Sequence, residues 1–311
     1  MGVIVTGMHR SGTSMTAQWV DGLGVPPAPG QPFPVDAANA EGLFEIQEIV
    51  ALDDKWLGIL GGSWWAPPPV REQTWRSIDG VALDQARSQL GSLHELGGRW
   101  YVKDPRISLL LPLWDRLTLR RQGVVLAVRE HREVAMSLHV RNGTTYRRAL
   151  ALWWAYNDAL VRHVFDRNSL VLDFSQSLAE PRPAIEALVD LLGAEGFSVP
   201  VDAADGLVGD LRPSRKRQRT EHLDGSAERL AADLDDHLLA LQSAHGHTVP
   251  DRLPAAPDWV QEALDELTEF WSMVVERDIA RSSAASALAA SSRAQRRTVG
   301  QRLRGSLRRP R

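Results

Sequence analysis

Short apolar runs rich in β-branched residues alternate with helical patterns over the first 200 residues. The predicted strands are Val3–Val5, 99–103, 124–128 and 170–172. The first predicted helix follows the first strand and its turn, and it ends at about Gly22. The other helices predicted in this part of the chain span 45–60, 81–96, 109–119, 132–140, 146–165 and 183–192. This alternation is typical of βαβ units, so we predict an α/β fold with a parallel sheet flanked by helices.

The pattern changes after Pro200. Residues 202–210 are acidic and predict a loop, whereas 228–243 and 259–279 have helical spacing. The residues after Arg281 are rich in Ala, Ser and Arg, a composition typical of a flexible segment. We therefore predict an α/β domain over 1–220, a helical C-terminal extension over 221–280 and a flexible basic tail over 281–311.

Composition narrows the class of protein. Of the 311 residues, 43% are hydrophobic and 24% are charged, which is typical of a soluble globular chain. The absence of cysteine excludes disulfides and thiolate metal sites, and no His, Asp or Glu spacing indicates a metal centre. No apolar run approaches the ~20 residues of a membrane span, and the start of the chain has no basic leader, so we expect a cytoplasmic protein.

Charge is distributed unevenly. The net charge is −3, but residues 279–311 contain nine arginines and no acid, and residues 1–278 carry 27 basic against 39 acidic groups, a net −12. A basic cluster within the acidic part therefore indicates an anionic ligand. The tail could contact anionic surfaces, although it lacks the interleaved aromatic residues that sequence-specific nucleic-acid recognition uses.

The most specific motif is the glycine-bearing turn after the first strand, Thr6-Gly7-Met8-His9-Arg10-Ser11-Gly12-Thr13-Ser14. A small-residue turn between a strand and a helix can direct backbone N–H groups at a phosphate. Gly7, Gly12 and Ser14 fit the pattern GxxxxGK[ST], but Thr13 stands where the lysine should be. That lysine contacts the β- and γ-phosphates of a triphosphate. A single 5′-phosphate is therefore a better ligand for this loop, with Arg10 as the cation.

Two segments resemble a known family. Arg10-Ser11-Gly12-Thr13-Ser14 resembles the 5′-phosphosulfate loop of sulfotransferases that use 3′-phosphoadenosine 5′-phosphosulfate (PAPS). Arg129 at the end of the third strand and Ser137 in the next helix are similar to the family's 3′-phosphate element. The resemblance covers about residues 1–220 and implies a P-loop-like fold, PAPS as the sulfuryl donor and no metal.

The resemblance also implies roles in catalysis. Arg10 would stabilise the leaving phosphate, and Lys103 would contact the sulfuryl oxygens, because Lys103-Asp104-Pro105-Arg106 is similar to a segment in bacterial members. Animal-type members carry a histidine just after this lysine, which this chain lacks. We therefore expect Glu45 to be the general base, with Glu41, Asp53 and Asp54 as alternatives.

Two further segments are candidates for ligand contact. The basic run Arg212–Arg219, including Arg212 and Arg215, could close over the cofactor, or it could be a solvated charge run. Trp56, Trp64 and Trp65 could stack against an acceptor, or they could pack in the core. Phe174 starts a segment similar to one that often starts with tyrosine in the family.

The sequence therefore favours a PAPS-dependent sulfotransferase that acts on a hydroxyl of a carbohydrate, a glycolipid or a hydroxylated small molecule. A P-loop nucleotide kinase is the second hypothesis, and the absent loop lysine argues against it. A non-catalytic nucleotide-binding or interaction protein on the same fold is the third.

Overall fold

The computed structural model describes residues 2–34, 42–69, 75, 78–91, 99–118, 120–210, 223–278 and 281. The chain divides into two compact units, Met1–Leu267 and Thr268–Arg311. In the second unit the described residues 268–278 are helical. The first unit contains the sheet and all the candidate functional residues that the structure describes. No helix in the described part of the chain is both long and apolar enough to cross a membrane.

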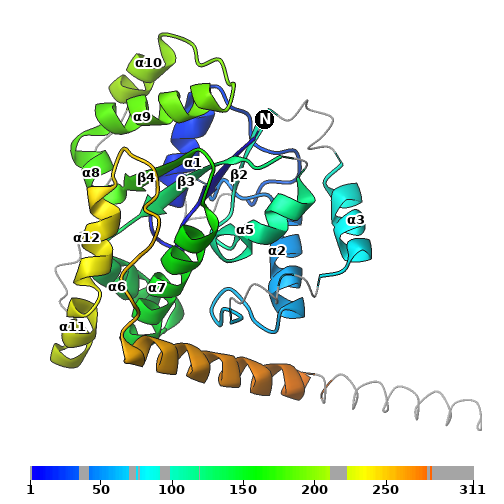
Figure 1. Ribbon diagram of the computed structural model, residues 1–311, viewed down its shortest axis with the longest axis vertical. Coiled ribbons are helices and arrows are strands. Elements are labelled where there is room, and N and C mark those ends of the chain that lie inside the picture. The colour runs from blue at the N-terminus through cyan, green and yellow to red at the C-terminus, as the bar shows by residue number, and fades with distance from the viewer. Residues whose placement is uncertain are drawn as a thin grey trace, which may run out of the picture. The chain divides into compact units, whose positions relative to one another are not determined.

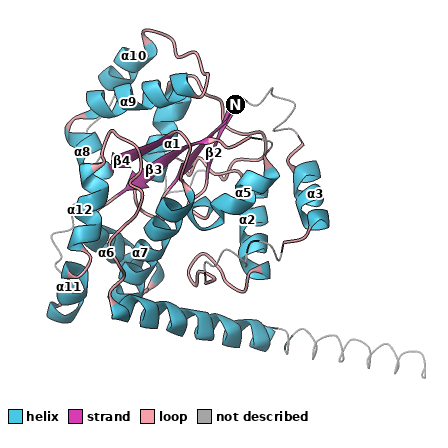
Figure 2. Cartoon of the chain, in the orientation of Figure 1, coloured by secondary structure: helices cyan, strands magenta, loops and turns pink. Residues whose placement is uncertain are grey.

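Four parallel strands form the sheet, in the order β2-β1-β3-β4 (Figure 1, Figure 2). The strands are β1 (Gly2–Thr6), β2 (Trp100–Lys103), β3 (Gly123–Val128) and β4 (Ser169–Asp173). Val5 is in register with Lys103, and Thr6 with Leu126. All residues of the four strands are buried, as expected for a parallel sheet covered on both faces. The predicted α/β fold with a parallel sheet flanked by helices is confirmed.

Helices connect the strands and cover the sheet. They are α1 (Thr13–Gly22), α2 (Gln47–Ile59), α3 (Gly80–Gln89), α5 (Ile107–Leu117), α6 (His131–Asn142), α7 (Tyr146–His163), α8 (Phe174–Ala179), α9 (Pro181–Ala194), α10 (Ala203–Asp210), α11 (Gly225–Ala232) and α12 (Asp235–Ser243). One hydrophobic cluster joins alternate strand residues, among them Val3 and Val125, to Trp19 of α1 and Leu188 of α9. Because successive strand side chains point to opposite faces, α1 and α9 cover the same face.

Two predicted elements differ from the structure. The prediction of a loop over 202–210 is wrong, because this segment is helix α10. Its apolar residues, Ala203, Ala204, Leu207 and Val208, pack against the hydrophobic cluster of α1 and α9. The single helix predicted over 228–243 is two helices, α11 and α12, separated by Asp233 and Leu234. Tertiary packing overrides the acidic composition in the first case.

Gly7 fixes where the chain leaves β1. Its φ is +142°, and a β-carbon there would clash with the backbone carbonyl oxygen of Ala127 in the neighbouring strand β3. The backbone of Ala127 is held by the sheet and cannot move aside. The close approach therefore requires glycine.

We expect Gly7→Ala to lower the free energy of unfolding by more than about 2 kcal/mol, because it adds a backbone clash to an unfavourable φ. Gly61→Ala is the matched control: Gly61 also has a positive φ, +83°, but a β-carbon there meets nothing within 4 Å. This control should cost about 1 kcal/mol. Urea denaturation measures both, and equal losses would show that the contact with Ala127 does not constrain the loop.

Candidate functional site

The loop between β1 and α1 has the geometry of an anion-binding turn. Arg10 and Gly12 both have positive φ, +73° and +91°. The N-cap of α1 is Gly12, which has no side chain to accept a hydrogen bond from the first N–H groups of the helix. Ser11 is 1% exposed, and its Oγ has no hydrogen-bond partner among the described residues. Unsatisfied donors at a helix N-terminus favour an anion.

The two motifs recognised in the sequence meet in space. Arg10 Nε donates a hydrogen bond to Ser137 Oγ of α6 at 2.9 Å, although 127 positions separate the residues. Arg129, directly after β3, donates from Nη1 to the carbonyl oxygen of Arg10 at 3.3 Å. Its Nε donates to Glu133 at 2.6 Å. The structure thus brings Arg10, Arg129 and Ser137 to one place, beside Ser11 and Gly12.

Phe174 packs against Arg129 and lies beside Gly12. It follows β4, and its ring centroid lies 4.7 Å from the guanidinium carbon of Arg129. A β-carbon on Gly12 would come within 2.5 Å of the Phe174 ring. The ring therefore fills the space beside Gly12 and holds Arg129 by a cation–π contact. Phe174 lacks the hydroxyl that a tyrosine would have, and its aromatic face is the group that contacts Arg129.

Glu45 and Lys103 form a buried ion pair. Lys103 Nζ donates to Glu45 Oε1 at 2.6 Å, and the two residues are 4% and 8% exposed. Lys103 ends β2, whereas Glu45 precedes α2 and follows Phe44, a non-glycine residue with φ +56°. Strain of this kind costs about 1–3 kcal/mol and persists only where surrounding contacts impose it. Two of the three residues assigned to catalysis on sequence grounds, Glu45 and Lys103, are therefore in direct contact.

The turn after Lys103 carries a charged network that joins Asp53 and Asp54, the alternative bases, to Asp104 and Arg106, to which the sequence analysis gave no role. Asp104 is fully buried, and its Oδ1 accepts from the backbone N–H of Arg106 at 2.8 Å and from Arg106 Nη1 at 3.0 Å. Arg106 Nε donates to Asp54 at 2.7 Å. Asp53, also fully buried, accepts from Trp114 Nε1 at 2.9 Å. A signal existed, because Asp104 and Arg106 follow a strand end, where open α/β sheets place their ligands.

His9, within the β1–α1 loop, lies close to this network. Its ring centroid is 4.8 Å from that of Trp64 and 5.6 Å from that of Tyr156. Burial, with added repulsion from Arg106 and Lys103, lowers the pKa of His9 well below its usual range, so the imidazole is neutral at pH 7. Its Nε2 atom is buried and has no hydrogen-bond partner among the described residues. The packing of His9 against Trp64 and Tyr156 joins three segments that are distant in the sequence, so no local pattern could predict it.

The tryptophans that were candidates for stacking separate into two groups. Trp56 is 1% exposed and belongs to the core, so it cannot stack on a ligand. Trp64 and Trp65 are partly exposed. The backbone carbonyl oxygen of Trp64 accepts a hydrogen bond from the Tyr156 hydroxyl at 2.7 Å. This bond holds the Trp64 segment beside His9.

Several predicted site residues lie outside the described residues or have other partners. Arg212, Arg215 and Glu41 lie outside the described residues. Thr13 and Ser14 begin α1, and Ser14 Oγ donates to the carbonyl oxygen of Leu43 at 3.3 Å. That bond joins the start of α1 to the segment that carries Glu45.

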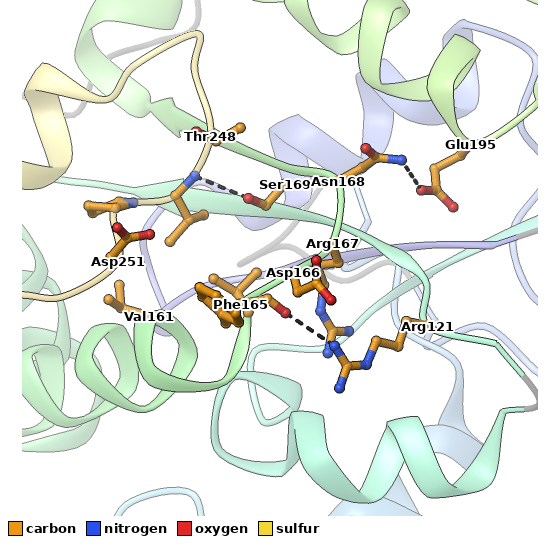
Figure 3. Close-up of a pocket in the computed structure, with 13 residues that line it drawn as sticks. Arg121, Val161, Phe165, Asp166, Arg167, Asn168, Ser169, Glu195, Thr248 and Asp251 are labelled. Atoms are coloured by element: carbon orange, nitrogen blue, oxygen red, sulfur yellow. Dashed lines mark hydrogen bonds between the residues drawn. The ribbon is translucent and has the colours of Figure 1, made fainter.

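A cavity of about 610 Å³ lies at the opposite edge of the sheet (Figure 3). It is bordered by Ser169, the first residue of β4, and by Arg121, which precedes β3. Many of its polar groups already have protein partners: Asn168 donates to Glu195 at 2.7 Å, and Ser169 Oγ accepts from the Val249 N–H at 3.1 Å. None of the predicted site residues lines this cavity. The carboxyl edge of the sheet is therefore the candidate functional site.

We expect Lys103→Met to lower the free energy of unfolding by about 3–5 kcal/mol, because it leaves the Glu45 carboxylate buried without its partner. The double variant Lys103→Met/Glu45→Gln should recover part of the loss. Lys55→Met, at an exposed lysine, is the control and should change stability by less than about 0.5 kcal/mol. Urea denaturation measures all three. Wild-type stability in Lys103→Met would mean that the ion pair is not buried in solution.

Comparison with known proteins leaves the family open. No protein-family model matches this chain, and no curated protein matches it significantly. The carboxyl edge of the sheet brings together the β1–α1 loop, the buried Glu45–Lys103 pair, and arginines that are paired with neighbouring acids.

Proposed function

We propose that this protein is a PAPS-dependent sulfotransferase that transfers the sulfuryl group to a hydroxyl of a carbohydrate, a glycolipid or a hydroxylated small molecule. The observation that carries the proposal is the 2.9 Å hydrogen bond from Arg10 to Ser137. It joins the two segments that separately resemble the 5′- and 3′-phosphate elements of that family. Because β1 and β3 are parallel neighbours, the segments that follow them lie at the same edge of the sheet, and this hydrogen bond brings one side chain of each segment into direct contact there.

The donors at this edge fit a nucleotide with two phosphate groups. The buried Ser11 hydroxyl has no described partner, and the first N–H groups of α1 have no side-chain cap. Arg129 and Ser137 would hold the 3′-phosphate, and Arg10, which donates to Ser137, would contact the 5′-phosphate held by the loop. A nucleoside triphosphate is less well supported, because Thr13 occupies the position of the lysine that contacts β- and γ-phosphates.

The proposed chemistry divides among three residues. PAPS, when bound, supplies the sulfuryl group and leaves as adenosine 3′,5′-bisphosphate. Arg10 places positive charge at the leaving phosphate, and Lys103 places it at the sulfuryl oxygens. Glu45 accepts the hydroxyl proton. Because Glu45 is paired with Lys103, its protonation removes the negative charge that holds the ammonium group. Proton transfer to Glu45 and release of Lys103 are thus coupled.

Titration calorimetry with adenosine 3′,5′-bisphosphate tests the nucleotide site. We expect the wild type to bind the bisphosphate more tightly than ATP·Mg²⁺, and Arg129→Ala to weaken that binding by about 10- to 100-fold, the value of a hydrogen bond to a charged group. Arg162→Ala is the matched control, because Arg162 is exposed and pairs with Asp158. A preference for ATP·Mg²⁺ would contradict the proposal and favour the kinase hypothesis.

The turnover of Glu45→Gln tests the general base. A screen with labelled PAPS first identifies an acceptor. We expect Glu45→Gln to lower kcat on that acceptor by about 10²- to 10⁴-fold, because the amide cannot accept the hydroxyl proton. Affinity for the bisphosphate should stay within a few-fold of the wild-type value. Glu48→Gln, an exposed acid in the first turn of α2, is the control. Full turnover by Glu45→Gln would show that another group is the base.

A further inference from the structure

Two buried carboxyl groups lie close together at the Lys103–Arg106 turn. Asp53 on α2 and Asp104 after β2 are both 0% exposed. Each has one oxygen that accepts hydrogen bonds and one, Oδ2, that has no partner among the described residues. The Asp104 side chain lies within hydrogen-bonding reach of Asp53. Two ionised carboxylates in such contact repel each other strongly, so a shared proton is the stable arrangement.

The surroundings decide which of the two acids holds that proton. Burial raises the pKa of Asp104 too, but its Oδ1 accepts two hydrogen bonds from Arg106, one of them from the guanidinium group, and both favour its ionised form. Among the described residues, Asp53 accepts only from the neutral indole N–H of Trp114. Burial, followed by the charge of Asp104, raises the pKa of Asp53 well above its usual range. The proton therefore belongs to Asp53.

We propose that Asp53 is a neutral carboxylic acid at pH 7, that its hydroxyl donates a hydrogen bond to Asp104, and that it thereby positions Arg106 beside Lys103. Asp53 is a positioning residue, since it acts only through Asp104 and Arg106. The proposal concerns the protein without ligand and does not rest on the sulfotransferase assignment.

The neighbouring charges explain why this proton matters for the site. Glu45 faces Asp104 and is paired with Lys103, whereas Asp54 is paired with Arg106. If Asp53 ionised, it would add a negative charge close to Lys103 and Arg106, whose charges are already paired with acids. The added charge would compete with Asp104 for Arg106 and weaken the attraction of the edge for an anion.

The matched substitutions are Asp53→Asn and Asp53→Ala. The asparagine amide can donate to Asp104 and keep a carbonyl oxygen for Trp114, so we expect Asp53→Asn to be at least as stable as the wild type at pH 7. Alanine removes both bonds, so we expect Asp53→Ala to raise the unfolding equilibrium constant by at least about 10-fold. Urea denaturation from pH 4 to pH 8 measures both variants and the wild type.

The pH dependence has a defined sign. The folded-state pKa of Asp53 is raised, so unfolding releases a proton, and the wild type loses stability as pH rises from the ordinary aspartate pKa toward the raised one. Relative to Asp53→Asn, the wild-type unfolding constant should therefore increase by up to about 10-fold per pH unit over this range. An amide has no such dependence, so the comparison isolates Asp53.

Carboxyl ¹³C NMR of the full chain, with Asp53→Asn used for assignment, gives a direct readout. We expect the Asp53 signal to stay at the protonated position at pH 7. An ionised Asp53 at pH 7, a pH-independent difference between wild type and Asp53→Asn, or equal destabilisation by Asn and Ala would each overturn the proposal. Failure of the wild type to bind adenosine 3′,5′-bisphosphate would instead count against the proposed function and leave these three readouts unaffected.

Discussion

The parallel alignment of β1 between β2 and β3 is the constraint on which the rest of the site depends. It brings the carboxyl ends of three strands to one edge, and the residues that follow them, Gly7, Asp104 and Arg129, become neighbours. The loop after β1 can lie against β3 only because Gly7 has no side chain. The hydrogen bonds from Arg10 to Ser137 and from Arg129 to the Arg10 carbonyl oxygen are possible only in that position.

Charge at this edge is arranged in closely matched pairs. Lys103 pairs with Glu45, Arg129 with Glu133, and Arg106 with Asp54 and Asp104. Burying a charge without a partner would cost several kcal/mol, so these acids are needed to keep cations inside an acidic part of the chain. Neutral His9 adds no charge to this group.

Backbone strain is concentrated near the same edge. Two of the three described non-glycine residues with positive φ are Arg10 and Phe44, which lie in the loop and directly before Glu45. Tertiary contacts hold both residues in these backbone conformations. Phe44 packs against the hydrophobic cluster of α1 and α9, and Arg10 donates a hydrogen bond to Ser137. Strain of this kind costs free energy and persists only where surrounding contacts impose it.

The sequence by itself determined the strands, the order of most helices and the loop at Gly7–Ser14, because these depend on local periodicity and on residue types with restricted backbone geometry. It also singled out Arg10, Arg129 and Ser137, which the tertiary structure brings together. Only the tertiary structure decided that α10 is a helix, that Trp56 is core and that Asp53 faces Asp104. These outcomes depend on which surfaces and charges meet across many residues of chain, and no local pattern encodes burial between distant segments.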